Sequence, residues 1–206
     1  MDEPLEIGSL VCFGRWYGED IEWRVLDVEP TRVLRITDKA SDCRHSHRTP
    51  EAITWSECSL RAWLNGEFLQ EAFDPSERAT ILEVRIANDD NPDFGIPGGP
   101  DTRDKVFCLS IDEARIYFGS IKERVCFPTP HARERGVWTS AAGSCDWWLR
   151  SPGGWSDGAA AANVVRDGAV HTTGDGVAGG LDGDDNIVAI ETAVRPALWI
   201  RKDPSL

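Results

Sequence analysis

The segment Cys145–Ile200 opens on Trp147-Trp148-Leu149-Arg150-Ser151-Pro152-Gly153 and closes on Val194-Arg195-Pro196-Ala197-Leu198-Trp199-Ile200. Aromatic and aliphatic side chains dominate both ends, which predicts that both are buried. Between them the sequence is small and polar, and 9 of the 19 glycines lie in residues 153–183. Two apolar anchors around a segment with almost no core of its own favour a scaffold that displays a surface.

Each anchor contains one arginine, Arg150 or Arg195, among residues that are typical of a core. A buried guanidinium group needs carboxylate or carbonyl partners, because an unpaired charge in the interior is strongly destabilising. We therefore predict that Arg150 and Arg195 hold the backbone of this segment in place, in preference to binding a substrate carboxylate.

The N-terminal part of the chain has the period-two pattern of half-buried strands. Apolar and charged residues alternate through 21–28, Glu29-Pro30-Thr31 breaks the pattern, and it resumes at 32–37. The two runs predict a hairpin, preceded by a strand at 10–13. We expect further short strands at 84–86, 106–109, 187–190 and 197–200.

Three helices are predicted from their capping residues. The first would open at Thr54-Trp55-Ser56-Glu57 and end at Asn65-Gly66. The second would open at Asp74-Pro75-Ser76-Glu77, and the third at Ser110-Ile111-Asp112-Glu113 with its end at Gly119.

Residues 120–137 mix charges and prolines and predict a covering loop. Asp167-Gly168 predicts a hairpin with a tight primed turn, and further turns are expected at 174–177 and 182–186. Two to three helices among strands and turns predict an α+β fold with antiparallel sheets, in a single domain over residues 1–206.

Composition excludes several classes of partner. The net charge of −13 disfavours nucleic acid and anionic membrane surfaces, because like charges repel. No apolar run is long enough to cross a membrane, and Asp2 and Glu3 are unlike the basic start of a signal peptide. We expect a cytoplasmic chain, or one displayed on a phage or cell surface by another route.

The sequence contains no familiar catalytic motif. His45 and His47 near Cys43 form an H-x-H pattern, but no second ligand pair accompanies it, so a solvated loop is favoured over a metal site. Residues 88–104 are rich in oxygen ligands without the spacing of a calcium loop. Cys145 precedes two tryptophans, and burial beside them would raise the pKa of its thiol and lower its reactivity. The prediction is a protein that is not an enzyme and has no assigned cofactor, with Ca²⁺ as an unassigned candidate.

Several motifs together resemble the bacterial domain family DUF6273 over about residues 7–200. They include WWLRSPG at 147–153, the Asp167-Gly168 hairpin and VRPALW at 194–199. Upstream, the similarity continues in Ile21-Glu22-Trp23-Arg24-Val25-Leu26, in Leu60-Arg61-Ala62-Trp63-Leu64-Asn65 and in Asp104-Lys105-Val106-Phe107-Cys108-Leu109-Ser110.

This family is similar to the C-type-lectin fold of the formylglycine-generating-enzyme type. Members of that fold include the variable proteins of diversity-generating retroelements, in which mutagenesis rewrites exposed residues on a ligand-binding face. The resemblance implies a non-enzymatic ligand-binding domain with a variable region at about 147–199. Residues 178–193 form a longer spacer than the family pattern has. The expected exposed ligand-binding residues are Trp155, Ser156, Asp157, Asn163, Val165, Arg166, His171, Thr172, Thr173, Asp175, Glu191 and Thr192.

The expected ligand is a protein, a peptide or a carbohydrate, and the oligomeric state is left open. Two alternatives remain. One is an enzyme of the formylglycine-generating type, which would need two cysteines such as Cys126 and Cys145 to meet in space and bind copper. The other is a structural accessory domain of a phage or cell-surface assembly.

Overall fold

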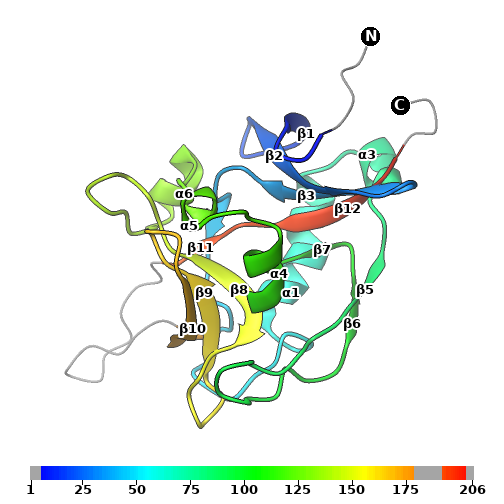
Figure 1. The fold of residues 1–206 in the computed structure, drawn as a ribbon. Helices are drawn as coiled ribbons and strands as arrows, with labels where there is room; N and C mark the ends of the chain where they lie inside the picture. Colours follow the sequence, from blue (N-terminus) through cyan, green and yellow to red (C-terminus); the bar gives the residue numbers. More distant parts are fainter. Residues whose placement is uncertain (1–5, 179–191, 203–206) are drawn as a thin grey trace.

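The alternating pattern of the N-terminal residues produces the first of two five-stranded sheets. A computed structural model describes residues 6–178 and 192–202 (Figure 1). The first sheet has the order β1-β2-β3-β12-β7, and all its neighbouring strands are antiparallel. Its strands are β1 (Leu10–Trp16), β2 (Glu19–Val28), β3 (Arg32–Thr37), β7 (Val106–Phe107) and β12 (Ala197–Arg201). The hairpin predicted at 21–28 and 32–37 and the strand at 10–13 are confirmed.

The second sheet contains the opening anchor and has the order β10-β9-β8-β11-β4. Its strands pair antiparallel except for β11, which runs parallel to β8. They are β4 (Asp42–Cys43), β8 (Trp147–Pro152), β9 (Ala160–Val164), β10 (Val170–Gly176) and β11 (Ala193–Val194). In Figure 1 this sheet lies below the first one, and β11 leads directly into β12. The closing anchor thus connects the two sheets.

Short helices and a two-stranded ribbon complete the fold. The ribbon pairs β5 (Val84–Ile86) with β6 (Thr102–Asp104). The helical segments are α1 (Ser59–Trp63), the π-helical η1 (Leu64–Phe68), α2 (Leu69–Glu71), α3 (Pro75–Thr80), α4 (Ile111–Ile116), α5 (Ile121–Arg124) and α6 (Pro130–Glu134). None of the helices in the described ranges has the length and hydropathy needed to cross a bilayer.

Two of the three predicted helix starts are confirmed. Asp74 and Glu77 form a capping box on α3, and Ser110 and Glu113 form one on α4. The start predicted at Thr54 is wrong, because residues 55–57 form a turn and Cys58 caps α1 instead. Trp55 fixes that turn through a 2.9 Å hydrogen bond from Nε1 to Asp104.

The helix end predicted at Asn65-Gly66 is also wrong. Helical structure continues through η1 and α2 as far as Glu71. Asn65 donates to the carbonyl of Val106 at 2.8 Å and accepts from the amide of Lys105 at 2.8 Å. Because these bonds join the helix to β7, and Phe68 is fully buried, tertiary contacts outweigh the low helix propensity of glycine.

Other turn predictions need correction. The connection between β9 and β10 is longer than a primed turn: Gly168 has a φ of 89° while Asp167 has no positive φ. Residues 174–176 belong to β10, and the predicted loop at 120–137 contains α5 and α6, so helices are more numerous than expected. The predictions at 182–186 and 187–190 lie outside the described residues.

One hydrophobic core spans both sheets and the helices between them. Trp23, Trp147, Trp148, Phe68 and Phe107 are among its largest fully buried side chains. A single α+β domain built on antiparallel pairing is therefore confirmed, with the anchor strands in its interior.

Candidate ligand-binding surface

The strands β8 and β9 form a rigid base for the glycine-rich segment. All six residues of β8 and all five of β9 are buried. Trp147 donates its Nε1–H to the carbonyl of Arg124 at 3.0 Å, and Trp148 donates to that of Arg44 at 2.8 Å. Both indoles thus combine apolar packing with a satisfied polar group, which fixes their orientation.

Arg150 lies inside this base and is 6% exposed. Its guanidinium group binds both carboxylate oxygens of Glu113, and it donates to the carbonyls of Cys108 at 3.0 Å and Ala87 at 3.1 Å. The side chain joins β8, α4 and the end of β5, and the prediction of a structural role is confirmed.

Arg195 is 1% exposed and connects the closing anchor to β3. It donates to the carbonyl oxygens of Thr37 at 2.8 Å and Asp38 at 3.3 Å. The guanidinium carbon lies 5.2 Å from the ring centroid of Phe118 and 5.0 Å from that of Trp147. The predicted structural role is confirmed here too, with aromatic rings in place of a carboxylate.

The segment above the base exposes most of the predicted ligand-binding residues. Trp155 is 40% exposed. The other residues of the 153–158 loop and of β10 range from buried to exposed. The exposed residues of the predicted set are Trp155, Ser156, Asp157, Arg166 and Thr173, and the partly exposed ones are Val165, His171, Thr172 and Asp175.

Two predicted members of the exposed set are buried, so that part of the prediction is wrong. Asn163 is 0% exposed near the end of β9 and donates to the carboxylate of Asp175. Thr192 is 7% exposed beside β11. Asn163 pairs with strands on both sides, and Thr192 directly precedes the inner strand β11. A polar side chain in a single sequence does not reveal such contacts. Glu191 lies outside the described residues.

The loop that follows β8 is held by a residue that the sequence analysis missed. Asn91 donates from Nδ2 to the carbonyls of Pro152 and Thr172, both at 2.8 Å. Its Oδ1 accepts from the backbone amides of Asp93 at 3.0 Å and Phe94 at 3.2 Å. One buried amide therefore joins the 88–100 loop to both β8 and β10.

Phe94 packs directly against this loop and is itself 49% exposed. A Cβ atom added to Gly154 would lie 2.6 Å from the Phe94 ring, which explains why glycine stands there. Phe94 and Trp155 thus place two exposed aromatic rings on loops that are in contact. In the sequence, Phe94 could have been recognised as a candidate because it is an aromatic residue directly after the polar run 88–93.

A groove lies where the loops around residues 52–57, 96–97 and 158 converge. Its volume is about 240 Å³. Apolar groups dominate the wall, which includes Ala52, Ile53, Ile96, Pro97, Pro152 and Gly158. A concave apolar feature beside exposed aromatic and polar side chains has the composition of a ligand-binding region.

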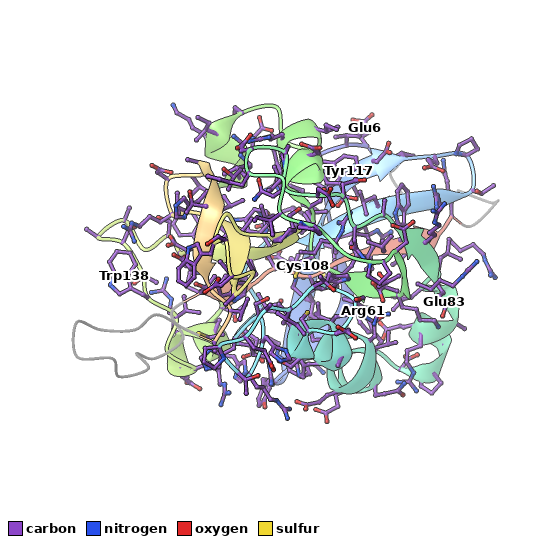
Figure 2. All side chains as sticks on the ribbon, turned by 90° about the horizontal axis from the view of Figure 1, so that it is seen from below. Glu6, Arg61, Glu83, Cys108, Tyr117 and Trp138 are labelled. Atoms are coloured by element: carbon purple, nitrogen blue, oxygen red, sulfur yellow. The ribbon has the colours of Figure 1, made fainter. Side chains whose placement is uncertain are left out.

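The other edge of the surface is charged. The amide of Arg166 donates to Asp146 at 2.7 Å, and the guanidinium carbon lies 4.3 Å from the ring centroid of Trp138. Figure 2 shows Trp138 at the periphery of the molecule, where it is 42% exposed. Burial raises the pKa of Asp146 above its ordinary value, partly offset by the hydrogen bond from Arg166.

The polar clusters that suggested metal sites have structural partners. His47 accepts from the amide of Ser59 at 3.1 Å and contacts Glu51 at 3.2 Å. Asp90 accepts from the amide of Gly98 at 3.1 Å within the oxygen-rich loop. In the described part of the chain, no three His, Cys, Asp or Glu side chains gather as metal ligands would.

The two cysteines required by the enzymatic alternative do come together. Cys126 and Cys145 face each other in an isolated antiparallel bridge. They are 1% and 0% exposed, respectively, so neither thiol is open to a large substrate. Burial also raises the pKa of Cys58, to about 11, which is typical of an unreactive core thiol.

Comparisons with known proteins identify the family. A search of curated proteins and a search of solved structures found no match to this chain. A family model described as a domain of unknown function, DUF6273, matches residues 31–202. The match covers both anchors, β3 to β12 and the whole candidate surface, and on this basis the chain belongs to the DUF6273 family.

Proposed function

We propose that this chain is a non-enzymatic ligand-binding domain whose recognition surface lies on the 153–158 loop, β10 and the adjoining groove. One observation carries the proposal. Every residue of β8 is buried, whereas three consecutive residues of the following loop, Trp155, Ser156 and Asp157, are exposed. A site with replaceable side chains needs a backbone that is held by other residues.

Those other residues are present on each side of the surface. Arg150 holds β8, which leads into the loop, Asn91 holds the start of the loop and β10, and Arg195 holds the closing anchor. None of these three belongs to the exposed set, so ligand choice and backbone geometry reside in different residues. This division supports a surface that tolerates substitution.

The finer proposal is a C-type-lectin-like scaffold that serves as the variable protein of a diversity-generating retroelement. Its support is the resemblance of the two anchors to that cassette together with the exposure of the residues between them. A neighbouring reverse transcriptase gene and a near-identical template repeat for codons of about 147–199 would be expected. A genome with neither would contradict the retroelement role while leaving ligand binding intact.

The surface favours a ligand with both apolar and polar groups. Phe94 and Trp155 offer aromatic area, and Asp157, Arg166 and Thr173 offer charge and hydrogen bonds. Exposed aromatic residues are typical anchors for protein partners, and they also stack on sugar rings. Peptides, folded proteins and carbohydrates therefore remain the proposed classes.

The test replaces the exposed residues as a set. We expect a Trp155→Ala, Ser156→Ala, Asp157→Ala variant to keep its melting temperature within about 3 °C, because surface substitutions change stability little. Wild type and variant would then be screened on a glycan array and against a displayed peptide library. The proposal expects the bound set to change between the two proteins.

The matched control is a triple alanine variant at exposed positions away from the surface, Glu83, Arg85 and Arg103 on the β5–β6 ribbon. This control should keep both stability and the bound set. Cooperative unfolding of the 155–157 variant, or identical binding by all three proteins, would overturn the proposal and favour a structural accessory domain.

A further inference from the structure

The Cys126–Cys145 pair is positioned for a covalent link. The two residues are direct partners in an antiparallel bridge, and the amide of Cys145 donates to the carbonyl of Cys126 at 2.9 Å. The thiol of Cys145 lies 3.6 Å from the same carbonyl oxygen, and the two thiols share a hydrogen bond. Residues in a hydrogen-bonded antiparallel pair have Cα atoms about 5.5 Å apart, which lies within the range that a disulfide spans.

A buried positive charge lies beside this pair. Arg195 is 1% exposed, and among the described residues it forms no ion pair with a carboxylate. Its buried Nη1 group has no hydrogen-bond partner within residues 6–178 and 192–202, although Nε and Nη2 both donate to backbone carbonyls. A guanidinium charge in the interior calls for an anion, and the charge of Arg195 acts on both thiols.

The pair lies just beneath the surface. Phe127, which follows Cys126, is 45% exposed. Cys145 follows a tight turn in which the amide of Gly143 donates to the carbonyl of Ser140 at 2.8 Å, and residues 141–142 are exposed. A small oxidant the size of water therefore needs only a local opening of this turn to reach the thiols.

We propose that Cys126 and Cys145 form a redox-active dithiol that hydrogen peroxide or a related small peroxide oxidises to a disulfide. The thiolate of Cys126 attacks one peroxide oxygen, the O–O bond breaks, and hydroxide leaves and takes up a proton to become water. The sulfur of Cys145 then attacks the resulting sulfenic acid and loses its proton, and a second water leaves. Two electrons pass from the two sulfurs to the peroxide.

The ionisation of the pair supports the order of these steps. Burial opposes thiolate formation at Cys126, but the hydrogen bond from Cys145 and the charge of Arg195 outweigh it and lower the pKa to about 7. The hydrogen bond to Cys126 and burial raise the pKa of Cys145. Asp38 and Asp146 are the other charged groups that act on the pair, and both disfavour a thiolate.

The disulfide would change the edge of the candidate surface. It would close a loop over residues 127–144, which includes α6 and Trp138. Trp138 stacks on Arg166, a member of the predicted ligand-binding set. Oxidation would restrict this loop and therefore the position of the Trp138 ring.

The test treats the reduced full chain with an equivalent of hydrogen peroxide and maps disulfides by mass spectrometry after alkylation and proteolysis. We use Cys12→Ser as the parent protein, because Cys12 is the exposed thiol among the described cysteines. The expected product is one cross-linked peptide pair containing residues 126 and 145, two mass units lighter than its reduced form. The oxidised protein should melt about 5 °C or more above the reduced one, because the link restricts the unfolded chain.

Trapping of the intermediate separates the two sulfurs. The folded variants are oxidised first and then unfolded in the presence of the sulfenic-acid probe dimedone, because the buried site excludes the probe. Cys126 should be labelled in Cys145→Ser, whereas Cys145 should stay unlabelled in Cys126→Ser. Cys58→Ser is the matched buried control and should keep the 126–145 link. A folded parent that gives no 126–145 peptide, or that gives it only in urea, overturns the proposal. The assay requires no ligand, so its outcome is independent of the proposed binding function.

Discussion

Strand β8 and the loop that follows it are neighbours in sequence but differ in what holds them. Trp147 is 0% exposed and bonded through its indole, whereas Trp155 is 40% exposed with no hydrogen bond from its indole in the described contacts. Both regions contain a tryptophan, an aspartate or arginine and several small residues. The type of residue therefore does not show whether a position tolerates substitution. Its burial and its hydrogen-bond partners do.

The largest loss of stability is expected at the buried tryptophan of β8. Trp147→Ala should lower the free energy of unfolding by about 3–5 kcal/mol, because it leaves a cavity and an unpaired carbonyl at Arg124. Urea denaturation followed by circular dichroism measures this change. Trp155→Ala is the matched control, and a loss similar to that of Trp147→Ala would remove the distinction between the two regions.

A smaller effect is expected from the arginines. Arg150→Met should destabilise the fold by about 3 kcal/mol, because Glu113 and two carbonyls lose their donor in the interior. Arg166→Met removes an exposed cation–π contact with Trp138 and should change stability by about 1 kcal/mol or less. The same denaturation assay compares them, and equal values would place Arg166 among the structural residues.

Asn163 tests whether a polar residue of the segment belongs to the base. Asn163→Asp should destabilise the protein by about 2 kcal/mol at pH 7, because the new carboxylate is buried beside that of Asp175. Burial and like charge raise the folded pKa of the new carboxyl, so the loss is present above that pKa and disappears as pH falls through it. Unfolding measured at pH 7 and pH 5 checks this sign.

Thr173→Asp is the control for that substitution, because Thr173 is exposed on the neighbouring strand. It should show little loss at either pH. If Asn163→Asp behaved in the same way, β9 would be open enough to accept charge, and Asn163 would rejoin the candidate surface.

The smallest effect has the opposite sign. Burial raises the pKa of Asp146, so its ionised form is less favourable in the folded state than in the unfolded state. Asp146→Asn should stabilise the protein by at most about 1 kcal/mol at pH 7, while its carbonyl still accepts from the amide of Arg166. The gain should shrink as pH falls through the raised pKa, and a gain that persists at pH 4 would point to another cause.

Local signals in the sequence predicted the elements whose bonds are local. The capping boxes at Asp74 and Ser110 and the β2–β3 hairpin are set by residues within a few positions of one another. The start at Thr54 failed because Asp104, far along the chain, fixes Trp55. The extent of the helix past Gly66 depends on β7 in the same way.

The same distinction between local and distant contacts applies to the candidate surface. Exposure of Asp157 follows from glycines and polar neighbours close in sequence, whereas the same neighbours fit Trp155 as a buried residue or as an exposed anchor. The burial of Asn163 depends on β8 and β10 pairing on either side, and the role of Asn91 depends on contacts with Pro152 and Thr172. Structural roles for Arg150 and Arg195 were predictable, because a charge among core residues must find partners. The identity of those partners was not predictable, because they lie far away in sequence.

The positions of β11 and β12 have a consequence for the order in which the protein forms on the ribosome. β11 is an inner strand of one sheet, between β8 and β4, and β12 is an inner strand of the other, between β3 and β7. Neither sheet can close until residues 193–201 have left the exit tunnel, so most of the chain waits for its last strands. Pairings between residues so distant in sequence also make folding slow. Until then the nascent chain would expose the strand edges on which β11 and β12 pair, which makes it a natural client for chaperones.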